Sequence, residues 1–187
     1  QSVRTLHCNV RTKSPCGIPA KSFDITLSGD ETYEDIYPLR ESSANPSASL
    51  RVKAWLAIMR GCDTFCRYCV VPYTRGRERS RSASGIIKEV RQLVREGFSQ
   101  VTLLGQNVNS YFHDGIDFPE LLSMVSAVKG LERIWFTSPH PKDFPDKLID
   151  LIASDPKICK HIHLPLQSGS SAILKKMNRP YTKKQYL

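Results

Sequence analysis

Residues 53–69, KAWLAIMRGCDTFCRYC, join a short apolar run to three closely spaced cysteines. The run 53–59 has the length and the composition of a buried strand. Cys62, Cys66 and Cys69 follow it in a C-x3-C-x2-C pattern. The stretch therefore predicts a strand whose following loop carries three thiols, which are either structural or ligands of a metal centre.

Three interpretations of the cysteines are open. A structural zinc site takes four ligands, so a distant pair such as His161-x-His163 would have to complete one. A 4Fe-4S cluster that only carries electrons also takes four thiolates, so three cysteines would leave one iron open to bind a substrate. In the third interpretation the thiols are core residues, but the polar residues Asp63, Thr64 and Arg67 stand between them. The pattern favours the cluster.

Short apolar runs alternate with amphipathic stretches from residue 50 onward. The runs 101–104, 133–136 and 161–164 follow the first strand at intervals of about thirty residues, the length of one strand-helix unit. Such alternation is typical of α/β proteins with a parallel sheet. Because a closed barrel needs more than four strands, we expect an α/β fold with a partial, incomplete parallel β/α barrel.

Helical periodicity fills the segments between the runs. The first helix has an apolar stripe from Ile86 to Val94 and stops at Gly97. The second begins with the capping box Asp117-x-x-Glu120. Two shorter helices are expected around Leu148, Ile149 and Ile152, and around Ile173, Leu174 and Met177.

The chain ends at the start of a further helix. Thr182-x-x-Gln185 is a capping box, and Tyr186 and Leu187 would begin the apolar face of that helix. Together with the low number of strands, this helix start predicts that the chain is truncated or a partial gene product.

The N-terminal segment differs from the remainder of the chain. It is polar, rich in serine and proline, and shows no sustained periodicity. We expect residues 1–49 to form an irregular arm and interdomain linker, and residues 50–187 to form the truncated barrel core.

The composition is that of a globular protein with a basic surface. The hydrophobic fraction is 40%, and no apolar run approaches the roughly 18 to 20 residues that cross a bilayer. No signal peptide is recognisable, so we expect a cytoplasmic location, where six cysteines serve as metal or catalytic ligands sooner than as disulfides. The net charge of +9 and a pI near 9.4 favour a polyanionic partner such as nucleic acid.

The cysteine triad, with Tyr68 before its last member, resembles the signature of radical S-adenosylmethionine enzymes. The resemblance implies that Cys62, Cys66 and Cys69 hold three irons of a 4Fe-4S cluster. It further implies that the fourth iron binds the methionine part of S-adenosylmethionine and that Tyr68 lies beside the adenine. Electron transfer from the reduced cluster would then cleave S-adenosylmethionine to methionine and a 5′-deoxyadenosyl radical.

Four further blocks resemble the methylthiotransferase branch of this family, and the likeness covers roughly residues 50–187. They are VVPYTRGRERSR (70–81), LLGQNVNSY (103–111), SPHPKDF (138–144) and HLPLQSGSSAILKKMNRPYT (163–182).

Within the branch the blocks are most similar to the tRNA enzymes that act on isopentenyl-adenosine. The resemblance implies methylthiolation of carbon 2 of that adenine beside the anticodon, where radical hydrogen abstraction is needed because the carbon has no acidic proton. The alternatives are a methylthiotransferase for a ribosomal protein or for threonylcarbamoyl-adenosine tRNA, and a catalytically incomplete iron-sulfur fragment.

The resemblance also implies partners and a second cofactor. The partners are tRNA and an electron donor such as flavodoxin or ferredoxin. We expect no association with a membrane, and we expect the protein to be a monomer. Full-length members carry a second 4Fe-4S cluster in an N-terminal domain and a C-terminal β-barrel, and Cys8 and Cys16 do not match the ligand motifs of that domain. We therefore expect this chain to assemble the radical cluster without completing sulfur insertion.

Four arginines alternate directly after the cysteines. Arg75, Arg77, Arg79 and Arg81 have the density expected for phosphate contacts of a nucleic acid. The alternatives are a solvated basic loop, or arginines tied to carboxylates of the barrel.

Polar residues follow two of the predicted strands, at the ends where parallel barrels carry their active residues. Gln106 and Asn107 follow the run 101–104, and Gln167 and Ser168 follow the run 161–164. By the resemblance they face S-adenosylmethionine or the substrate base, and the alternative is a role in bracing turns. His140, between two prolines, is either a base or part of a rigid loop, and its role stays open.

Overall fold

The computed structural model describes residues 52–187. The predicted arm over residues 1–49, with Cys8 and Cys16, lies outside the described residues, and so does its boundary with the core. Every helix of the described part is too short or too polar to span a membrane.

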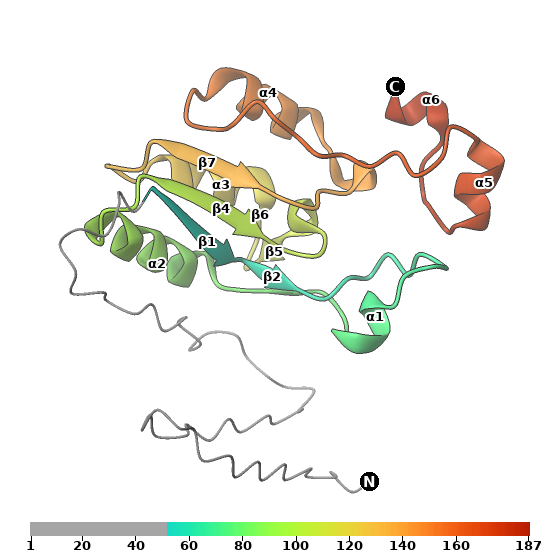
Figure 1. The fold of residues 1–187 in the computed structure, drawn as a ribbon, viewed down its shortest axis with the longest axis horizontal. Coiled ribbons are helices and arrows are strands. Elements are labelled where there is room, and N and C mark those ends of the chain that lie inside the picture. Colours follow the sequence, from blue (N-terminus) through green and yellow to red (C-terminus); the bar gives the residue numbers. More distant parts are fainter. Residues whose placement is uncertain (1–51) are drawn as a thin grey trace, which may run out of the picture. The chain divides into compact units, whose positions relative to one another are not determined.

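Within residues 52–187 the central element is a parallel sheet of three strands in the order β1, β4, β7 (Figure 1). In register, Lys53 lies opposite Gln100, which in turn lies opposite Arg133. The strands are β1 (Lys53–Ala57), β4 (Gln100–Leu104) and β7 (Arg133–Phe136). The predicted strands at 101–104 and 133–136 are thus confirmed, and so is the parallel α/β class.

The first predicted strand is divided in two. After β1 the chain forms β2 (Met59–Arg60), which pairs antiparallel with β3 (Arg79–Ser80). The backbone of Ile58, between β1 and β2, accepts a hydrogen bond from Arg81 N at 2.9 Å. The segment that carries the cysteines therefore forms a long excursion between β2 and β3.

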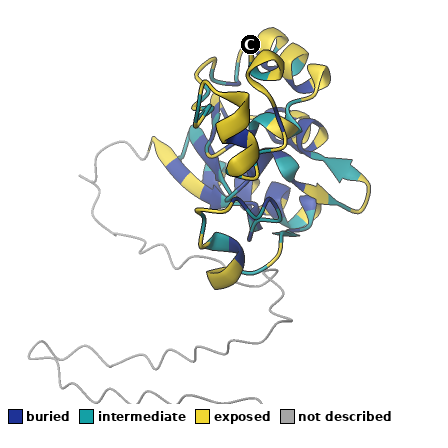
Figure 2. Cartoon of the chain, turned by 90° about the vertical axis from the view of Figure 1, so that its right-hand side faces the viewer, coloured by how far each residue is buried: buried dark blue, intermediate teal, exposed yellow. Residues whose placement is uncertain are grey.

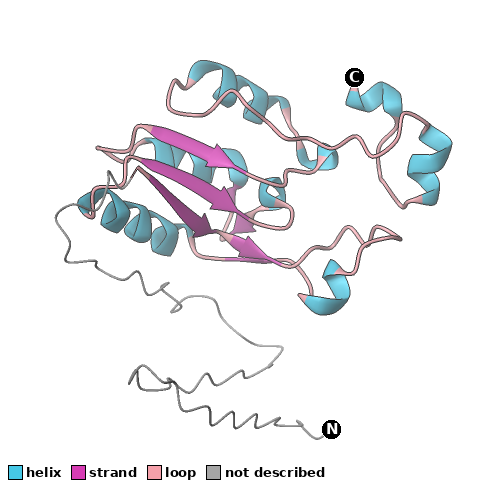
Figure 3. Ribbon diagram, in the orientation of Figure 1, coloured by secondary structure: helices cyan, strands magenta, loops and turns pink. Residues whose placement is uncertain are grey.

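Each connection between the parallel strands contains one of the longer helices, α2 (Ala83–Arg95) between β1 and β4 and α3 (Phe118–Ser126) between β4 and β7, and further helices follow β7 (Figure 3). The main helices after β7 are α4 (Asp146–Ser154), α5 (Ser171–Lys176) and α6 (Lys183–Tyr186). The minor elements are α1 (Val71–Thr74), η2 (Val108–Ser110), β5 (Phe112–His113), β6 (Ile116–Asp117) and η3 (Pro141–Asp143).

The helix ends follow their local sequence. At the start of α3, the Asp117 side chain accepts from Glu120 N at 2.9 Å, and the Glu120 side chain accepts from Asp117 N at 3.3 Å. The same reciprocal box forms at α6 between Thr182 and Gln185. α2 ends before Gly97, whose φ of 92° is costly for residues with a Cβ. These predicted caps and stops are confirmed.

One core joins the sheet to the helices. Alternate strand residues, among them Leu56, Val101, Leu103 and Ile134, are buried with the apolar stripes of α2 and α3. α3 packs against both α2 and α4. Figure 2 shows this buried interior in dark blue, with the outer surfaces of the helices in yellow.

The fourth predicted strand, over 161–164, is wrong. The chain meets β7 earlier: Ile134 N donates to Lys157 O at 2.8 Å, and Cys159 N donates to Ile134 O at 2.9 Å. Only an isolated bridge forms there, centred on buried Ile158. The alternation of side chains along 161–164 is compatible with a strand, but a strand also requires hydrogen bonds from its backbone to a partner strand. The free edge of β7 is occupied by residues 157–159 instead.

The carboxyl ends of β1, β4 and β7 lie at one edge of the sheet. Figure 1 shows their arrowheads pointing toward the end of the molecule where α1 and α5 lie. In parallel β/α folds this edge carries the functional loops. The cysteines, Gln106 and residues 137–144 all follow strands that end there.

Candidate functional site

The cysteine segment, residues 61–69, begins at a glycine. Any other residue at this position would force the neighbouring backbone to move. Gly61 has a φ of 81°, and a Cβ placed on it would lie 2.0 Å from Arg77 O. Its N donates to the Gln106 side chain at 2.7 Å, and Cys62 N donates to Gly76 O at 3.3 Å. The start of the loop is therefore fixed between the hairpin that follows it and the end of β4.

The three thiols on this loop are free, and they differ in exposure. Cys66 is buried, whereas Cys62 and Cys69 are half-buried. A turn joins the last two, because Cys69 N donates to Cys66 O at 2.9 Å. Burial raises the pKa of the Cys66 thiol, the positive charge of Arg179 opposes that rise, and negative charge on Cys62 and Cys69 adds to it. The three thiols therefore lie on one short loop, with the last two joined by a turn.

The donor set fits a 4Fe-4S cluster. No three His, Cys, Asp or Glu side chains within residues 52–187 are grouped tightly enough to share one ion. A four-iron cluster does not require such convergence, because each thiolate binds a different iron. Three free thiols on one loop, one of them sheltered from water, are compatible with that arrangement.

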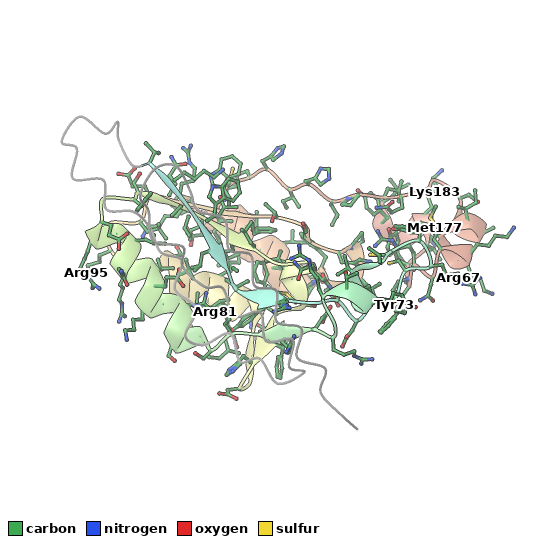
Figure 4. All side chains as sticks on the ribbon, turned by 60° about the horizontal axis from the view of Figure 1, so that its bottom comes forward. Arg67, Tyr73, Arg81, Arg95, Met177 and Lys183 are labelled. Carbon is green, nitrogen blue, oxygen red and sulfur yellow. The ribbon has the colours of Figure 1, made fainter. Side chains whose placement is uncertain are left out.

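A turn from the far end of the chain holds the cysteine loop in place. Asn178 has a φ of 58°, and its Nδ2 donates to Thr64 O at 3.2 Å and to Phe65 O at 3.0 Å. Next to it, Met177 O accepts from Arg67 N at 3.1 Å. Figure 4 shows Arg67 and Met177 at the same end of the molecule. We call residues 177–179 the clamp turn.

Arg179, the last residue of the clamp turn, reaches Tyr68. Its Nε donates to the Tyr68 hydroxyl at 3.1 Å, and its guanidinium lies 5.8 Å from the centre of that ring. On its other side the guanidinium lies 5.9 Å from the ring of Tyr181. Sequence reasoning did not single out Arg179 or Asn178, although both lie within the block 163–182, because their partners are more than a hundred residues away.

Of the residues predicted after β4, Gln106 and Asn107 both hold segments together. Gln106 joins the cysteine loop through Gly61. Asn107 is 1% exposed, and its Nδ2 donates to Asp143 Oδ2 at 2.9 Å and to Glu78 Oε1 at 3.3 Å. These bonds support the bracing alternative for Asn107, whereas Gln106 lies directly beside the thiols' loop.

Gln167 and Ser168 occupy a separate, more exposed loop. Gln167 is exposed with a φ of 69°, and Ser168 Oγ accepts from Ser170 N at 3.1 Å. Among the described residues, no hydrogen bond joins either of them to the cysteine loop. The structure thus brings together the cysteines, Tyr68 and Gln106, and leaves the pair 167–168 apart from them.

His140 is buried and tightly held. The side chain of Asn109 accepts from His140 N at 2.7 Å and donates to His140 O at 2.9 Å, which fixes the loop. The ring Nδ1 accepts from Lys142 N at 3.2 Å. Burial, and next the charges of Arg179 and Lys142, lower the pKa of His140 to about 3. Such an imidazole is a weak base, so these facts favour the rigid-loop interpretation.

The four alternating arginines separate into two groups. Arg81 is 6% exposed, its Nη2 lies 2.8 Å from Glu89 Oε2, and its Nη1 donates to Ala57 O at 2.6 Å. The predicted phosphate contact of Arg81 is therefore corrected, because a guanidinium buried between β1 and α2 is not available to a phosphate. Arg79 is half-buried in β3.

The other two arginines face water. Arg75 is exposed, and the Arg77 side chain is 72% exposed, with its Nε 2.8 Å from Asp63 Oδ1. Both lie on the hairpin beside the cysteine loop, where they remain candidates for phosphate contacts.

A second basic surface lies on α5 and α6, and the sequence reasoning did not identify it. All four of its lysines are exposed, and none forms an ion pair within the described part of the chain. A groove of about 450 Å³ beside them is lined by Lys175, Arg179, Tyr181 and Gln185, among others. We call the lysines the α5–α6 basic surface: Lys175, Lys176, Lys183 and Lys184.

Several curated bacterial proteins are similar in sequence. The protein from Bacteroides thetaiotaomicron is 50% identical over 172 residues, covering 89% of this chain and 36% of that protein. The one from Acetivibrio thermocellus is 56% identical over 139 residues, covering 73% of this chain and 29% of that protein. Both are named tRNA-2-methylthio-N(6)-dimethylallyladenosine synthase. The chain spans about a third of the length of these relatives, and the first match extends beyond residues 50–187 into the N-terminal segment.

Solved structures share the fold at low identity. The radical S-adenosylmethionine methyltransferase TsrM from Kitasatospora setae superposes with a TM-score of 0.57 at 19% identity, covering 71% of this chain and 27% of that one. The cobalamin-dependent S-adenosylmethionine radical enzyme OxsB gives a TM-score of 0.56 at 16% identity, covering 71% and 21%. These likenesses support the partial barrel architecture.

The family comparison covers the cysteine loop, the strands β4 and β7 and the clamp turn together. Residues 56–187, more than half of the chain, match the radical SAM superfamily. Together with the triad on the loop after the first strand, this match establishes that the chain belongs to the radical SAM superfamily.

Proposed function

We propose that this chain is the radical S-adenosylmethionine part of a tRNA methylthiotransferase that modifies carbon 2 of isopentenyl-adenosine beside the anticodon. The observation that carries the proposal is the loop of three free thiols at the carboxyl edge of the sheet. The substrate is inferred from the names of relatives that are about half identical to this chain.

In this proposal Cys62, Cys66 and Cys69 hold a 4Fe-4S cluster with one iron left open for S-adenosylmethionine. When bound, the reduced cluster supplies the electron that cleaves S-adenosylmethionine to a radical. The chain's own residues position and shelter the cluster. The buried environment of Cys66 keeps water away, and the Gly61–Gln106 hydrogen bond orients the loop.

Further residues are assigned to S-adenosylmethionine. Tyr68 is 53% exposed beside the thiols, so its ring can pack against the adenine. Gln167 and Ser168, on their exposed loop, are proposed to contact the same cofactor or the substrate base, and Asn107 to act through the loops that it braces. A second 4Fe-4S cluster belongs, by the family resemblance, to a domain of full-length members.

For tRNA, we propose phosphate contacts from two places beside the cysteine loop. One is the exposed pair Arg75 and Arg77, and the other is the α5–α6 basic surface. Exposed cations suit phosphate oxygens, the four lysines form no ion pair within the described residues, and the net charge of +9 favours association with RNA. We further propose a cytoplasmic, monomeric protein that receives electrons from a flavodoxin or a ferredoxin.

The test is anaerobic reconstitution with iron and sulfide, followed by electron paramagnetic resonance of the reduced protein with and without S-adenosylmethionine. We expect a 4Fe-4S signal that changes when S-adenosylmethionine is added and disappears in Cys66→Ala. The matched control is Cys159→Ala, which removes a free half-buried thiol outside the loop and should leave the signal intact.

The other functional classes predict other results. An electron-carrying iron-sulfur protein would give a signal that S-adenosylmethionine does not change, and a zinc protein would retain zinc and give none. A binding comparison separates the methylthiotransferases. The ligands are an anticodon stem-loop with isopentenyl-adenosine, one with threonylcarbamoyl-adenosine, and a ribosomal protein. Tighter binding to the threonylcarbamoyl-adenosine stem-loop or to the ribosomal protein would overturn the substrate assignment.

A further inference from the structure

Arg179 is a cation that no carboxylate neutralises in the described part of the chain. It is half-buried, and no Asp or Glu among residues 52–187 forms an ion pair with it. Its guanidinium lies instead near two phenol rings, those of Tyr68 and Tyr181. A half-buried guanidinium usually has an anionic partner, so this position points to negative charge that is supplied when the site is loaded.

The cysteine loop is the place where that negative charge would arise. Arg179 lies beside that loop, because its Nε donates to the hydroxyl of Tyr68, the residue before Cys69, at 3.1 Å, and the nearby Met177 O accepts from Arg67 N at 3.1 Å. The backbone around it is fixed, because Arg179 N donates to Leu174 O at 2.9 Å and the neighbouring Asn178 binds the carbonyls of Thr64 and Phe65. The guanidinium is therefore held beside the thiols and cannot swing away without losing its hydrogen bond to Tyr68.

We propose that Arg179 is a positioning residue of the cofactor site, which fixes the Tyr68 ring and stabilises the reduced cluster by its positive charge. This inference rests on the proposed function, since it requires a cluster at the three cysteines. One-electron reduction adds a negative charge to the cluster, and a nearby cation in a partly water-excluded site favours that reduced form. The charge of Arg179 thus raises the reduction potential, while its Nε hydrogen bond sets the ring against which S-adenosylmethionine packs.

The two roles can be separated by substitution. Arg179→Gln removes the charge and the ring contacts, whereas Arg179→Lys keeps the charge but loses the planar group that stacks on the rings. Arg77→Gln is the matched control, because Arg77 is also a cation beside the loop but is 72% exposed and paired with Asp63. Water and salt screen the effect of such a charge on the cluster.

The experiment is an anaerobic redox titration of the reconstituted chain with dithionite as reductant, monitored by electron paramagnetic resonance. We expect Arg179→Gln to lower the midpoint potential, Arg179→Lys to keep it close to that of the wild type, and Arg77→Gln to leave it unchanged. The spectral change caused by S-adenosylmethionine should be weaker in both Arg179 variants and normal in Arg77→Gln.

The outcomes distinguish this inference from the proposed function. If the wild type assembles no cluster that responds to S-adenosylmethionine, the proposed function fails and this inference with it. If the wild type responds and Arg179→Gln retains its potential, or shifts no further than Arg77→Gln, the inference alone is overturned. If Arg179→Gln binds no iron, the Arg179→Lys variant provides the test. A midpoint potential equal to that of the wild type, together with a weaker spectral response to S-adenosylmethionine, supports the inference, and any other combination rejects it.

Discussion

At the level of single residues, His140 illustrates how burial changes the behaviour of a side chain. Its pKa falls to about 3 because burial, Arg179 and Lys142 all disfavour the charged imidazole. In the unfolded chain a histidine titrates near pH 6.5. Between these values only the unfolded state gains the proton, so the stability that His140 contributes above pH 6.5 is lost as the pH falls toward 3.

We therefore predict that His140→Gln weakens the pH dependence of unfolding in this window. The wild type should lose on the order of a few kcal/mol between pH 6.5 and 3 through this residue, and the variant should not. Urea unfolding at a series of pH values measures the difference. The exposed His161 provides the control, because His161→Gln should leave the curve unchanged. Parallel curves for the wild type and His140→Gln would contradict the prediction.

Arg81 and Arg77 lie four residues apart in the same alternating run, yet they have opposite environments. Arg81→Met would remove the ion-pair partner that lies 2.8 Å from the Glu89 carboxylate, and Glu89 is 1% exposed. Breaking such a pair costs about 3 to 5 kcal/mol, whereas an exposed pair such as Arg77 with Asp63 contributes about 1 kcal/mol or less.

The prediction is a large loss of unfolding free energy for Arg81→Met and a small one for Arg77→Met, both measured by urea unfolding. Replacing both partners, as Arg81→Met with Glu89→Leu, should recover much of the loss because the carboxylate is removed together with the guanidinium. Equal losses for Arg81→Met and Arg77→Met would show that the buried pair is not the cause.

At the level of elements, the clamp turn joins the segment after α5 to the cysteine loop through side-chain and backbone bonds. Asn178→Gly keeps access to the left-handed backbone conformation but removes the two hydrogen bonds to Thr64 and Phe65. We predict that iron is lost faster to a chelator from this variant, by several-fold, with little change in global stability because each such bond contributes about 1 kcal/mol.

The measurement is the rate of bleaching of the reconstituted protein in the presence of a chelator. Asn109→Ala serves as the comparison, since its bonds brace the loop of His140 and not that of the cysteines. If both variants lost iron at the same rate, the effect would come from general loosening and not from the clamp turn.

At the level of the whole molecule, exposed positive charges lie at both ends of the described part of the chain. Figure 4 places Lys183 at the end with the cysteine loop and Arg95 at the other end. If RNA binds at the site end, only charges there release counterions when it binds. The contribution of a lysine to RNA affinity then depends on where it lies, and not only on the one unit that it adds to the net charge.

We predict that Lys183→Ala with Lys184→Ala weakens binding of an anticodon stem-loop and reduces the slope of log affinity against log salt by about 1 to 2. The control Arg95→Ala with Lys129→Ala removes the same charge from two exposed residues, the last residue of α2 and a residue that follows α3. Fluorescence anisotropy over a salt series measures both. A matching loss of slope in the control would mean that RNA binds by net charge alone.

The features that the sequence by itself determined arise from local patterns of residues. The strands β4 and β7, the stripe of α2, the capping boxes of α3 and α6 and the cysteine triad each depend on neighbouring residues, so their periodicity and spacing predict them. The tertiary structure alone decided which partner each segment meets. It placed 157–159 and not 161–164 against β7, buried Arg81 against Glu89 while leaving Arg77 in water, and brought Asn178 and Arg179 to the cysteine loop. The physical reason is that these outcomes depend on contacts between distant segments, and no local pattern encodes which distant partner will be within reach.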